Sequence, residues 1–138
     1  MTDRICPFSA TLVKNDFACR HATQVIRRGG TEFACRSEQA HTRCRQLYEH
    51  SKQAALPAFG VEDDLTQMPQ SVPVKIQFGS LLGLQRIMGD RAPGGDRIED
   101  IDALVAAAIS YYGAIDSVPY DQLVTNITSW KLSRRRGR

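Results

Sequence analysis

The sequence contains four cysteines but no two of them close together. They are Cys6, Cys19, Cys35 and Cys44, and 12, 15 and 8 residues separate successive ones. Structural zinc sites usually contain a pair of ligands two to four residues apart, and both bacterial and plant-type ferredoxins also depend on short spacings. The usual zinc and ferredoxin signatures are therefore excluded.

The chain also lacks a long apolar run. No stretch approaches the roughly 20 apolar residues of a membrane-spanning helix. Residues 1–16 do not combine a basic segment with a sustained apolar run, as a secretory signal would. We therefore expect a cytoplasmic protein without a membrane span. Because cytoplasmic thiols are kept reduced, the cysteines indicate a metal site, a redox sensor or buried core rather than structural disulfides.

Sequence signatures of catalysis are scarce. Residues 79–85, GSLLGLQ, have two glycines but neither the spacing nor the lysine of a phosphate-binding loop. Cys19 lies near His21 and Cys44 near His41, but no third orienting group or oxyanion donor accompanies either pair. We therefore predict that the protein is not an enzyme.

The net charge of +3 is concentrated at one end of the chain. Residues 131–138, KLSRRRGR, contain five basic residues and no acidic one, so the remainder is slightly acidic. We interpret residues 133–138 as a disordered basic tail that keeps the protein soluble. A sharper alternative is that it docks a protein partner, such as a redox protein or metalloenzyme. Nucleic acid is a less favoured partner, because we find no basic face interleaved with aromatics.

The length and composition are those of one globular domain. Apolar residues make up 42% and charged residues 24% of the 138 residues, which is ordinary for a folded protein. We predict a single compact domain over residues 1–132, mostly α with a minor β element. Its N-terminal half, residues 1–56, holds every cysteine and histidine, and an acidic connector follows over residues 57–71.

Hydrophobic periodicity predicts three helices. The first covers residues 37–55, with Ser37 as its N-cap, and has Cys44 on its inward stripe. The second covers residues 98–112, with acidic residues in its first turn, where they complement the helix dipole. The third runs from Pro119 to about Leu132, with Leu123, Ile127 and Trp130 facing inward.

Residues 74–78, VKIQF, alternate between apolar and polar side chains. This period predicts a short strand in which Val74, Ile76 and Phe78 face the core. Gly79 would end the strand, and Ser80 would cap a helix over residues 81–88.

The tetrapeptide Phe-Ala-Cys-Arg occurs twice, at residues 17–20 and 33–36. Two interpretations of the intervening chain remain open. One is a helix that ends at Gly29, and the other is a hairpin that turns at Gly29-Gly30 and pairs Ile26 with Phe33. Either one folds the chain back and brings Cys19 toward Cys35.

Helix geometry limits how the cysteines can meet. On one continuous helix, Cys35 and Cys44 would be roughly 13 Å apart along the axis and about half a turn around it. A helix that begins at Ser37 removes this conflict, because Cys35 then precedes it. With that break, thiolates from four separate backbone segments can converge on one site.

These observations predict one [4Fe–4S] cluster bound by Cys6, Cys19, Cys35 and Cys44, since widely spaced ligands suit a bulky cluster better than one small ion. The protein would serve in electron transfer, in redox sensing or as an accessory factor of a larger metalloenzyme. Arginines near the cysteines would lower thiol pKa values or offset thiolate charge; they are Arg4, Arg20, Arg36, Arg43 and Arg45.

Three other interpretations remain open. The cysteines could bind zinc in a module that contacts protein or nucleic acid. Cys19 and Cys35 could form a disulfide on oxidation in a metal-free thiol sensor. The cysteines could also be ordinary core residues, because free cysteine is often buried. Whether His21 or His41 contributes to the site also stays open.

Overall fold

The computed structural model describes residues 5–13, 16–27, 30–59, 71–89 and 97–129. The expected tail, Trp130 and most of the acidic connector lie outside these residues. In chain order, the elements are α1 (Ser9–Leu12), β1 (Ala22–Arg27), β2 (Gly30–Cys35), α2 (Glu38–Ala55), the 3-10 helix η1 (Leu56–Phe59), α3 (Ser71–Met88), α4 (Ile101–Tyr112), the 3-10 helix η4 (Ile115–Ser117) and α5 (Tyr120–Ser129).

The segment between the two Phe-Ala-Cys-Arg copies is a β-hairpin, so the helical alternative is wrong. Strands β1 and β2 pair antiparallel, with Arg27 opposite Gly30. This register places Ile26 opposite Thr31, so the expected pairing of Ile26 with Phe33 is also wrong. That pairing would require a turn centred one residue later. The side chain of Ile26 is consequently left 81% exposed.

Helix α2 confirms the predicted break after Cys35. Ser37 has an extended backbone, and its Oγ accepts a hydrogen bond from the backbone N–H of Ala40 at 3.1 Å. Serine at this position satisfies one of the N–H groups that a helix leaves unpaired at its start. The inward stripe includes Cys44 and Leu47, both buried. The strand therefore ends at Cys35, and Cys44 lies inside a separate helix.

The predicted strand over residues 74–78 is wrong, because these residues belong to helix α3. Ile76 and Phe78 are both buried, although they lie on different faces of the helix. A helix covered on most sides is apolar around its circumference, so a short window of it can imitate the alternation of a strand. Ser80 does not cap a new helix either, since its hydroxyl donates to the carbonyl of Ile76 within α3.

Gly79 does not end an element but allows two helices to approach closely. A Cβ atom at this position would lie 2.4 Å from the Cα of Ile127 in α5. At Gly83, one turn later, a Cβ would lie 2.9 Å from the Cβ of Asn126. Both glycines therefore provide the surface of α3 on which α5 packs.

Helices α4 and α5 confirm the other two predicted helices, with later starts. Asp100 caps α4 by accepting from the backbone N–H of Asp102 at 3.2 Å, which is why α4 begins at Ile101 and not at Ile98. Gly113 ends α4 with φ +94°, a left-handed conformation that favours glycine. In α5, Leu123 and Ile127 are buried as expected.

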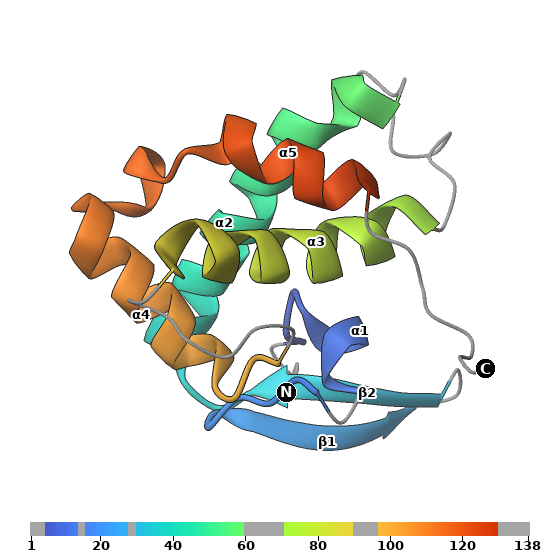
Figure 1. Ribbon diagram of the computed structural model, residues 1–138. Coiled ribbons are helices and arrows are strands. Elements are labelled where there is room, and N and C mark those ends of the chain that lie inside the picture. The colour runs from blue at the N-terminus through green and yellow to red at the C-terminus, as the bar shows by residue number, and fades with distance from the viewer. Residues whose placement is uncertain (1–4, 14–15, 28–29, 60–70, 90–96, 130–138) are drawn as a thin grey trace.

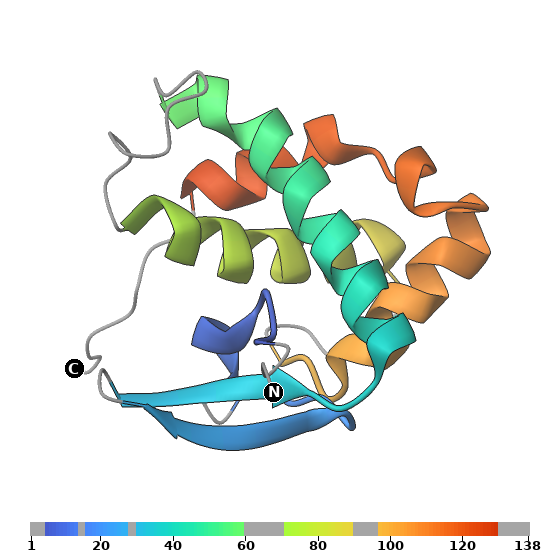
Figure 2. The same cartoon turned by 180° about the vertical axis from the view of Figure 1, so that it is seen from behind.

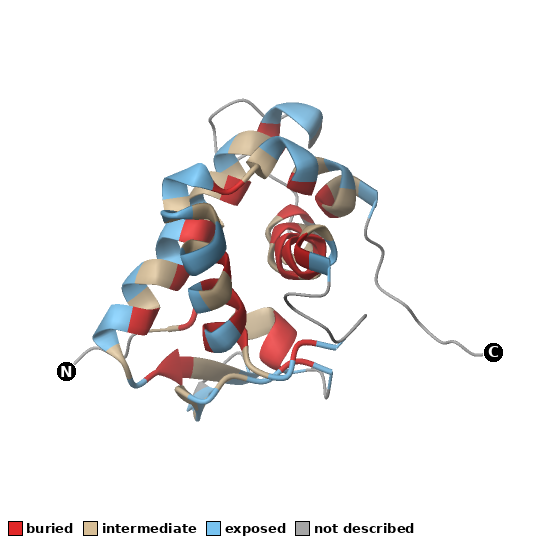
Figure 3. Cartoon of the chain, turned by 60° about the vertical axis from the view of Figure 1, so that its left-hand side comes forward, coloured by how far each residue is buried: buried red, intermediate tan, exposed pale blue. Residues whose placement is uncertain are grey.

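Helix α3 crosses the middle of the fold (Figure 1). The hairpin and α1 lie on one side of α3, while α5 packs along the other (Figure 1). Helix α2 crosses α3 on the face seen from behind (Figure 2). Figure 3 looks nearly along α3 and shows mainly buried residues on it. The chain thus forms a single compact, mostly helical domain with a two-stranded antiparallel sheet.

None of the helices within the described ranges has the length and apolar character needed to cross a membrane.

Candidate functional site

The four cysteines come from four different pieces of backbone. Cys6 follows Ile5, which bridges to Ala34, and its backbone N–H donates to the carbonyl of Phe33 at 2.8 Å. Cys19 precedes β1, Cys35 is the last residue of β2, and Cys44 lies in α2. The hairpin therefore holds three of these segments together, and α2 supplies the fourth.

All four cysteines line one small pocket. Its other lining residues are mostly small, namely Pro7, Ala22, Ala34, Ala40 and His41. The cavity volume is about 10 Å³, which is about the space of one water-sized sphere. The convergence expected from the sequence is thus present, in a tightly packed form.

The four thiols differ in exposure. Cys6, Cys35 and Cys44 are buried, whereas Cys19 is partly exposed. None of the four takes part in a disulfide. Cys19 is therefore the thiol most accessible from solvent.

Burial controls the acidity of three thiols. It raises the pKa of Cys6 to about 12, because a thiolate loses hydration there, and nearby Cys19 and Cys35 add to the effect. The pKa of Cys44 is raised by burial and then by the charges of the other three cysteines. Burial also raises the pKa of Cys19. The expected lowering of these pKa values by arginines is wrong.

Backbone N–H groups point at two of the sulfurs. The N–H of Phe8 donates to Sγ of Cys6 at 3.4 Å. The backbone N–H groups of His21 and Asp102 lower the pKa of Cys19 and so partly oppose the effect of its burial. Such donors stabilise negative charge on sulfur, which a thiolate ligand carries.

The thiol of Cys35 instead acts as a donor. Its Sγ donates to the carbonyl of Ser37 at 3.2 Å, across the junction between β2 and α2.

The histidines have partners other than thiols. His41 lines the pocket, but its Nε2 donates to the carbonyl of Ile5 at 3.1 Å. Nε2 of His21 lies 3.4 Å from Oδ2 of Asp102. His50 lies outside the pocket lining, since its Nε2 contacts Asp116 at 2.9 Å and its ring stacks on Tyr120.

Two of the arginines beside the cysteines pair with aspartates at the start of α4, namely its N-cap Asp100 and Asp102. Nε of Arg20 lies 2.5 Å from Oδ2 of Asp100, and Nη2 of Arg43 lies 2.8 Å from Oδ1 of Asp102. Burial alone would raise the pKa of Asp100, but hydrogen bonds and charge from Arg20 outweigh it and hold that pKa below its usual value. These arginines therefore have carboxylate partners.

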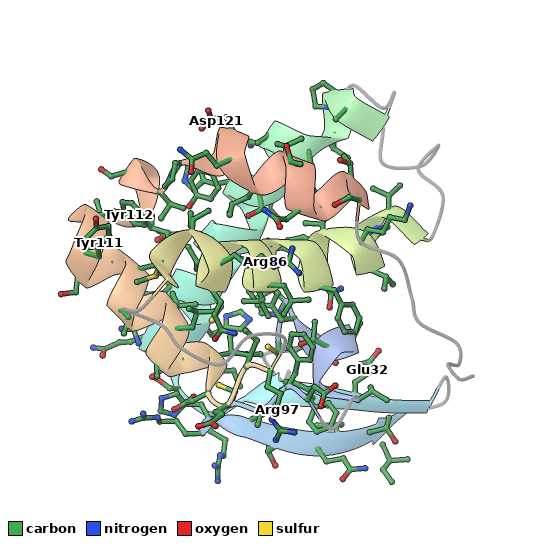
Figure 4. All side chains as sticks on the ribbon, viewed as in Figure 1. Glu32, Arg86, Arg97, Tyr111, Tyr112 and Asp121 are labelled. Atoms are coloured by element: carbon green, nitrogen blue, oxygen red, sulfur yellow. The ribbon has the colours of Figure 1, made fainter. Side chains whose placement is uncertain are left out.

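The other arginines near the cysteines are placed differently. Nη2 of Arg36 donates to the carbonyl of Arg20 at 2.9 Å, and Arg45 is exposed on α2. Arg4 lies outside the described residues. At the same end of the molecule, Arg97 lies beside the hairpin (Figure 4), and its Nη1 is 3.4 Å from Oδ1 of Asp16.

The thiols are not arranged around a single ion. Within the described ranges, no group of three or more His, Cys, Asp or Glu side chains meets the geometry for holding one metal ion. The four cysteines therefore share a pocket without forming a ready-made tetrahedral site.

A larger hollow, of about 420 Å³, lies elsewhere on α2. It is lined by Arg45, Gln46, Glu49, His50 and Gln53 and contains no cysteine. All five residues belong to one helix, so this hollow has no second wall from which groups converge.

Sequence reasoning missed the pocket wall and the aspartates. Ala22, Ala34 and Ala40 carry no chemical signal, since alanine is common in any fold. Asp100 and Asp102 were expected only to complement the dipole of their helix. The Asp-x-Asp spacing beside a helix start was the available signal, but the arginine partner of Asp100 is 80 residues away and that of Asp102 is 59 residues away.

Comparisons with models of known families, with curated proteins and with solved structures find no match to this chain.

Proposed function

We propose that this protein binds one [4Fe–4S] cluster through Cys6, Cys19, Cys35 and Cys44. It would act in electron transfer, in redox sensing or as an accessory factor of a larger metalloenzyme. The observation that carries the proposal is the convergence of four thiols, from four separate backbone segments, on one pocket. Cysteine thiolates are the usual ligands of such clusters.

The spacing of the ligands, rather than the size of the pocket, favours a cluster over one ion. No two cysteines have the close spacing of a structural zinc site, and the described side chains do not meet the geometry for holding one metal ion. The small side chains of Ala22, Ala34 and Ala40 leave the thiols as the main groups around the cavity. Because the cavity holds about one water-sized sphere, binding requires the thiols to turn or move outward.

Ligand binding and thiol ionisation are coupled at this site. The raised pKa values make the thiols of Cys6 and Cys44 harder to ionise than ordinary thiols in the cofactor-free protein. Metal ligation requires thiolates, so cluster assembly would release protons. The N–H groups directed at Cys6 and Cys19 would then stabilise the ligated thiolates.

The number of protein ligands supports an electron-transfer or sensing role. Four cysteines satisfy all four irons, which leaves no iron open to activate a substrate. Partly exposed Cys19 would be the ligand nearest to a redox partner.

The first test is the composition of protein expressed and purified without oxygen. We expect brown protein that contains about four iron and four sulfide per chain. Colourless protein with one zinc per chain would contradict the cluster and support the zinc module. Metal-free protein that loses two mass units on oxidation would instead support the thiol sensor.

Zinc is the second candidate because the cavity is small. A single ion needs less displacement of the thiols than a cluster does, although the described side chains do not form an ion site as they stand. Metal content therefore decides between the two, whereas cysteine substitution alone would not.

The second test assigns the ligands. Each cysteine is exchanged singly for alanine, and iron incorporation is measured in all four variants. Ser51→Ala is the matched control, because Ser51 is buried on the same face of α2 as Cys44 but does not line the pocket. We expect each cysteine variant to lose most of its iron and the control to retain it. Full incorporation in any one cysteine variant would remove that residue from the ligand set.

A further inference from the structure

Two aspartates at the start of α4 connect the segments that carry Cys19 and Cys44. Asp100 accepts from both the backbone N–H of Arg20, at 3.2 Å, and the side chain of Arg20. Arg20 directly follows Cys19. Asp100 therefore fixes the residue next to one thiol to the start of α4.

Asp102 contacts both thiol-bearing segments at once. Its Oδ1 lies 2.8 Å from Nη2 of Arg43, which directly precedes Cys44, and its Oδ2 lies 3.4 Å from Nε2 of His21. The residue is only 8% exposed. A carboxylate buried to this extent needs charged or hydrogen-bonding partners, and these two residues provide them.

Backbone hydrogen bonds hold the Cys19 segment against the same helix start. The N–H of Ala18 donates to the carbonyl of Ile98, and the N–H of Ile101 donates to the carbonyl of Ala18, at 3.0 and 2.8 Å. Asp102 contacts the same segment through its side chain, since its Oδ2 lies 3.4 Å from Nε2 of His21.

The side chain of Arg43 depends on its contact with Asp102. Its Nε is buried and has no hydrogen-bond partner among the described groups, while its Nη2 is bonded to Asp102. Removing either member of a partly buried ion pair leaves the other charge uncompensated. The pair therefore sets the local charge beside Cys44 as well as the position of α2 relative to α4.

We propose that Asp102 is a positioning residue of the thiol site: it holds Cys19 and Cys44 in place through His21 and Arg43, and its pair with Arg43 sets the charge that the bound group meets. This inference rests on the proposed function for the identity of the bound group. The positioning role of Asp102 applies to the cofactor-free chain as well.

The first experiment measures the reduction potential of the iron–sulfur centre in Asp102→Asn and Arg43→Gln. Loss of a negative charge favours the reduced, more negative cluster, so Asp102→Asn should raise the potential. Loss of a positive charge in Arg43→Gln should lower it. The double variant should return toward the wild-type value. A purely structural role would not shift the two single variants in opposite directions.

Matched controls remove charge from exposed side chains that do not line the pocket. Asp121→Asn changes an exposed aspartate of α5, which lies at the opposite end of the molecule from the hairpin (Figure 4). Arg45→Gln changes an exposed arginine on α2 that is close to Cys44 in sequence but does not line the pocket. Because water and salt screen exposed charges, both controls should leave the potential nearly unchanged.

The second experiment needs no cofactor. Cofactor-free protein is treated with iodoacetamide, and labelling of each cysteine is followed by mass spectrometry. We expect Cys19 and Cys44 to label several-fold faster in Asp102→Asn and in Arg43→Gln than in the two controls. Arg43→Gln keeps the test valid if Asp102→Asn does not fold, because the arginine side chain is 34% exposed.

The outcomes separate the two proposals. Wild-type protein that binds no cluster would overturn the proposed function, and the labelling rates would still decide the role of Asp102. Labelling as slow as in the controls would overturn the positioning role, whatever the protein binds. Potentials that shift in the same direction in both single variants would overturn the charge effect.

Discussion

The four cysteines have the same side chain but different chemistry, because their surroundings differ. Cys6 and Cys44 are buried, and burial raises the pKa of both thiols. Cys19 is partly exposed, and backbone N–H groups partly oppose the rise of its pKa on burial. An oxidant or alkylating reagent would therefore reach Cys19 first, even though all four thiols share one pocket.

The raised pKa of Cys6 predicts a loss of stability at high pH in the cofactor-free protein. The folded pKa of about 12 lies above the ordinary value of 9.0, so the folded state holds the proton more tightly than the unfolded chain does. The stabilisation is complete below pH 9.0 and is lost as pH rises toward 12. Each such thiol contributes a slope of up to about 1.4 kcal/mol per pH unit. Urea unfolding under reducing conditions would measure it.

A variant is needed to isolate Cys6, because burial also raises the pKa values of Tyr48 and Tyr120. Cys6→Ala removes one titrating group and leaves these tyrosines in place. Its free energy of unfolding should fall less steeply above about pH 9 than that of the wild type. Parallel pH profiles for the two proteins would show that Cys6 has the same pKa in the folded and unfolded states.

At the scale of elements, the start of α2 determines where two thiols lie. Ser37 separates Cys35, at the end of β2, from Cys44, inside the helix. Its hydroxyl accepts from Ala40, and the helix then proceeds for 18 residues. Without this cap, the first turn of α2 would lose a hydrogen-bond partner beside Cys35, whose Sγ donates to the carbonyl of Ser37.

Ser37→Ala should therefore destabilise the protein by about 1 kcal/mol, as loss of an N-cap usually does. Ser37→Asp should retain most of the stability, because a carboxylate can accept the same N–H and is favoured at a helix N-terminus. Chemical denaturation of the three proteins would measure the difference. Equal losses in the two variants would show that capping is not the function of Ser37.

The packing of α3 on α5 leads to a second prediction at this scale. Gly79→Ala would place a methyl group 2.4 Å from the backbone of Ile127, so the two helices must separate. Overpacking of this kind costs about 1–3 kcal/mol, which exceeds the gain of roughly 1 kcal/mol in helix propensity. We expect a net loss in thermal stability.

Gly83→Ala is the matched comparison. The methyl group would lie 2.9 Å from the Cβ of Asn126, which is a less severe overlap than the 2.4 Å between the Gly79→Ala methyl and the Cα of Ile127. Gly83→Ala should therefore cost less than Gly79→Ala. The reverse order in melting temperature would contradict this account of the helix contact.

At the scale of the whole molecule, the thiol pocket lies at one side of a much larger core. Most of the core consists of aliphatic residues from α2, α3, α4 and α5, such as Leu47, Ile76, Leu81, Val105 and Ile127. This core does not depend on a cofactor for its packing. A domain of this length buries enough surface to fold without a structural metal ion.

Removal of the proposed cofactor should thus destabilise the domain without unfolding it. A group bound only by the folded state stabilises that state, so its loss should lower the melting temperature by roughly 10 °C. The far-ultraviolet circular dichroism should stay helical. Cys44→Ala protein, which lacks one ligand, should show little change after the same treatment. Complete loss of helix on removal would contradict an independent core.

The predictions from sequence succeeded where local chemistry dominates. Ser37 caps α2 as predicted, and the helix predicted over residues 98–112 is present and ends at Tyr112, although its cap at Asp100 was not predicted. The prediction failed for residues 74–78, because a central helix is apolar on several faces and its pattern resembles a strand. It also missed the ion pair between Asp102 and Arg43, which are separated by 59 residues, since no local signal links them.

The sequence by itself determined that four thiols lie in the first third of the chain and that no two of them are as close as the ligand pairs of structural zinc sites. It also determined that a helix begins between Cys35 and Cys44. Only the tertiary structure decided that the chain from Cys19 to Cys35 folds back as a hairpin and that all four cysteines line one pocket. It also decided that aspartates at the start of α4 contact the segments that carry Cys19 and Cys44. The physical reason is distance along the chain: caps and periodicity act between near neighbours, whereas burial and ion pairing depend on residues that only the fold brings together.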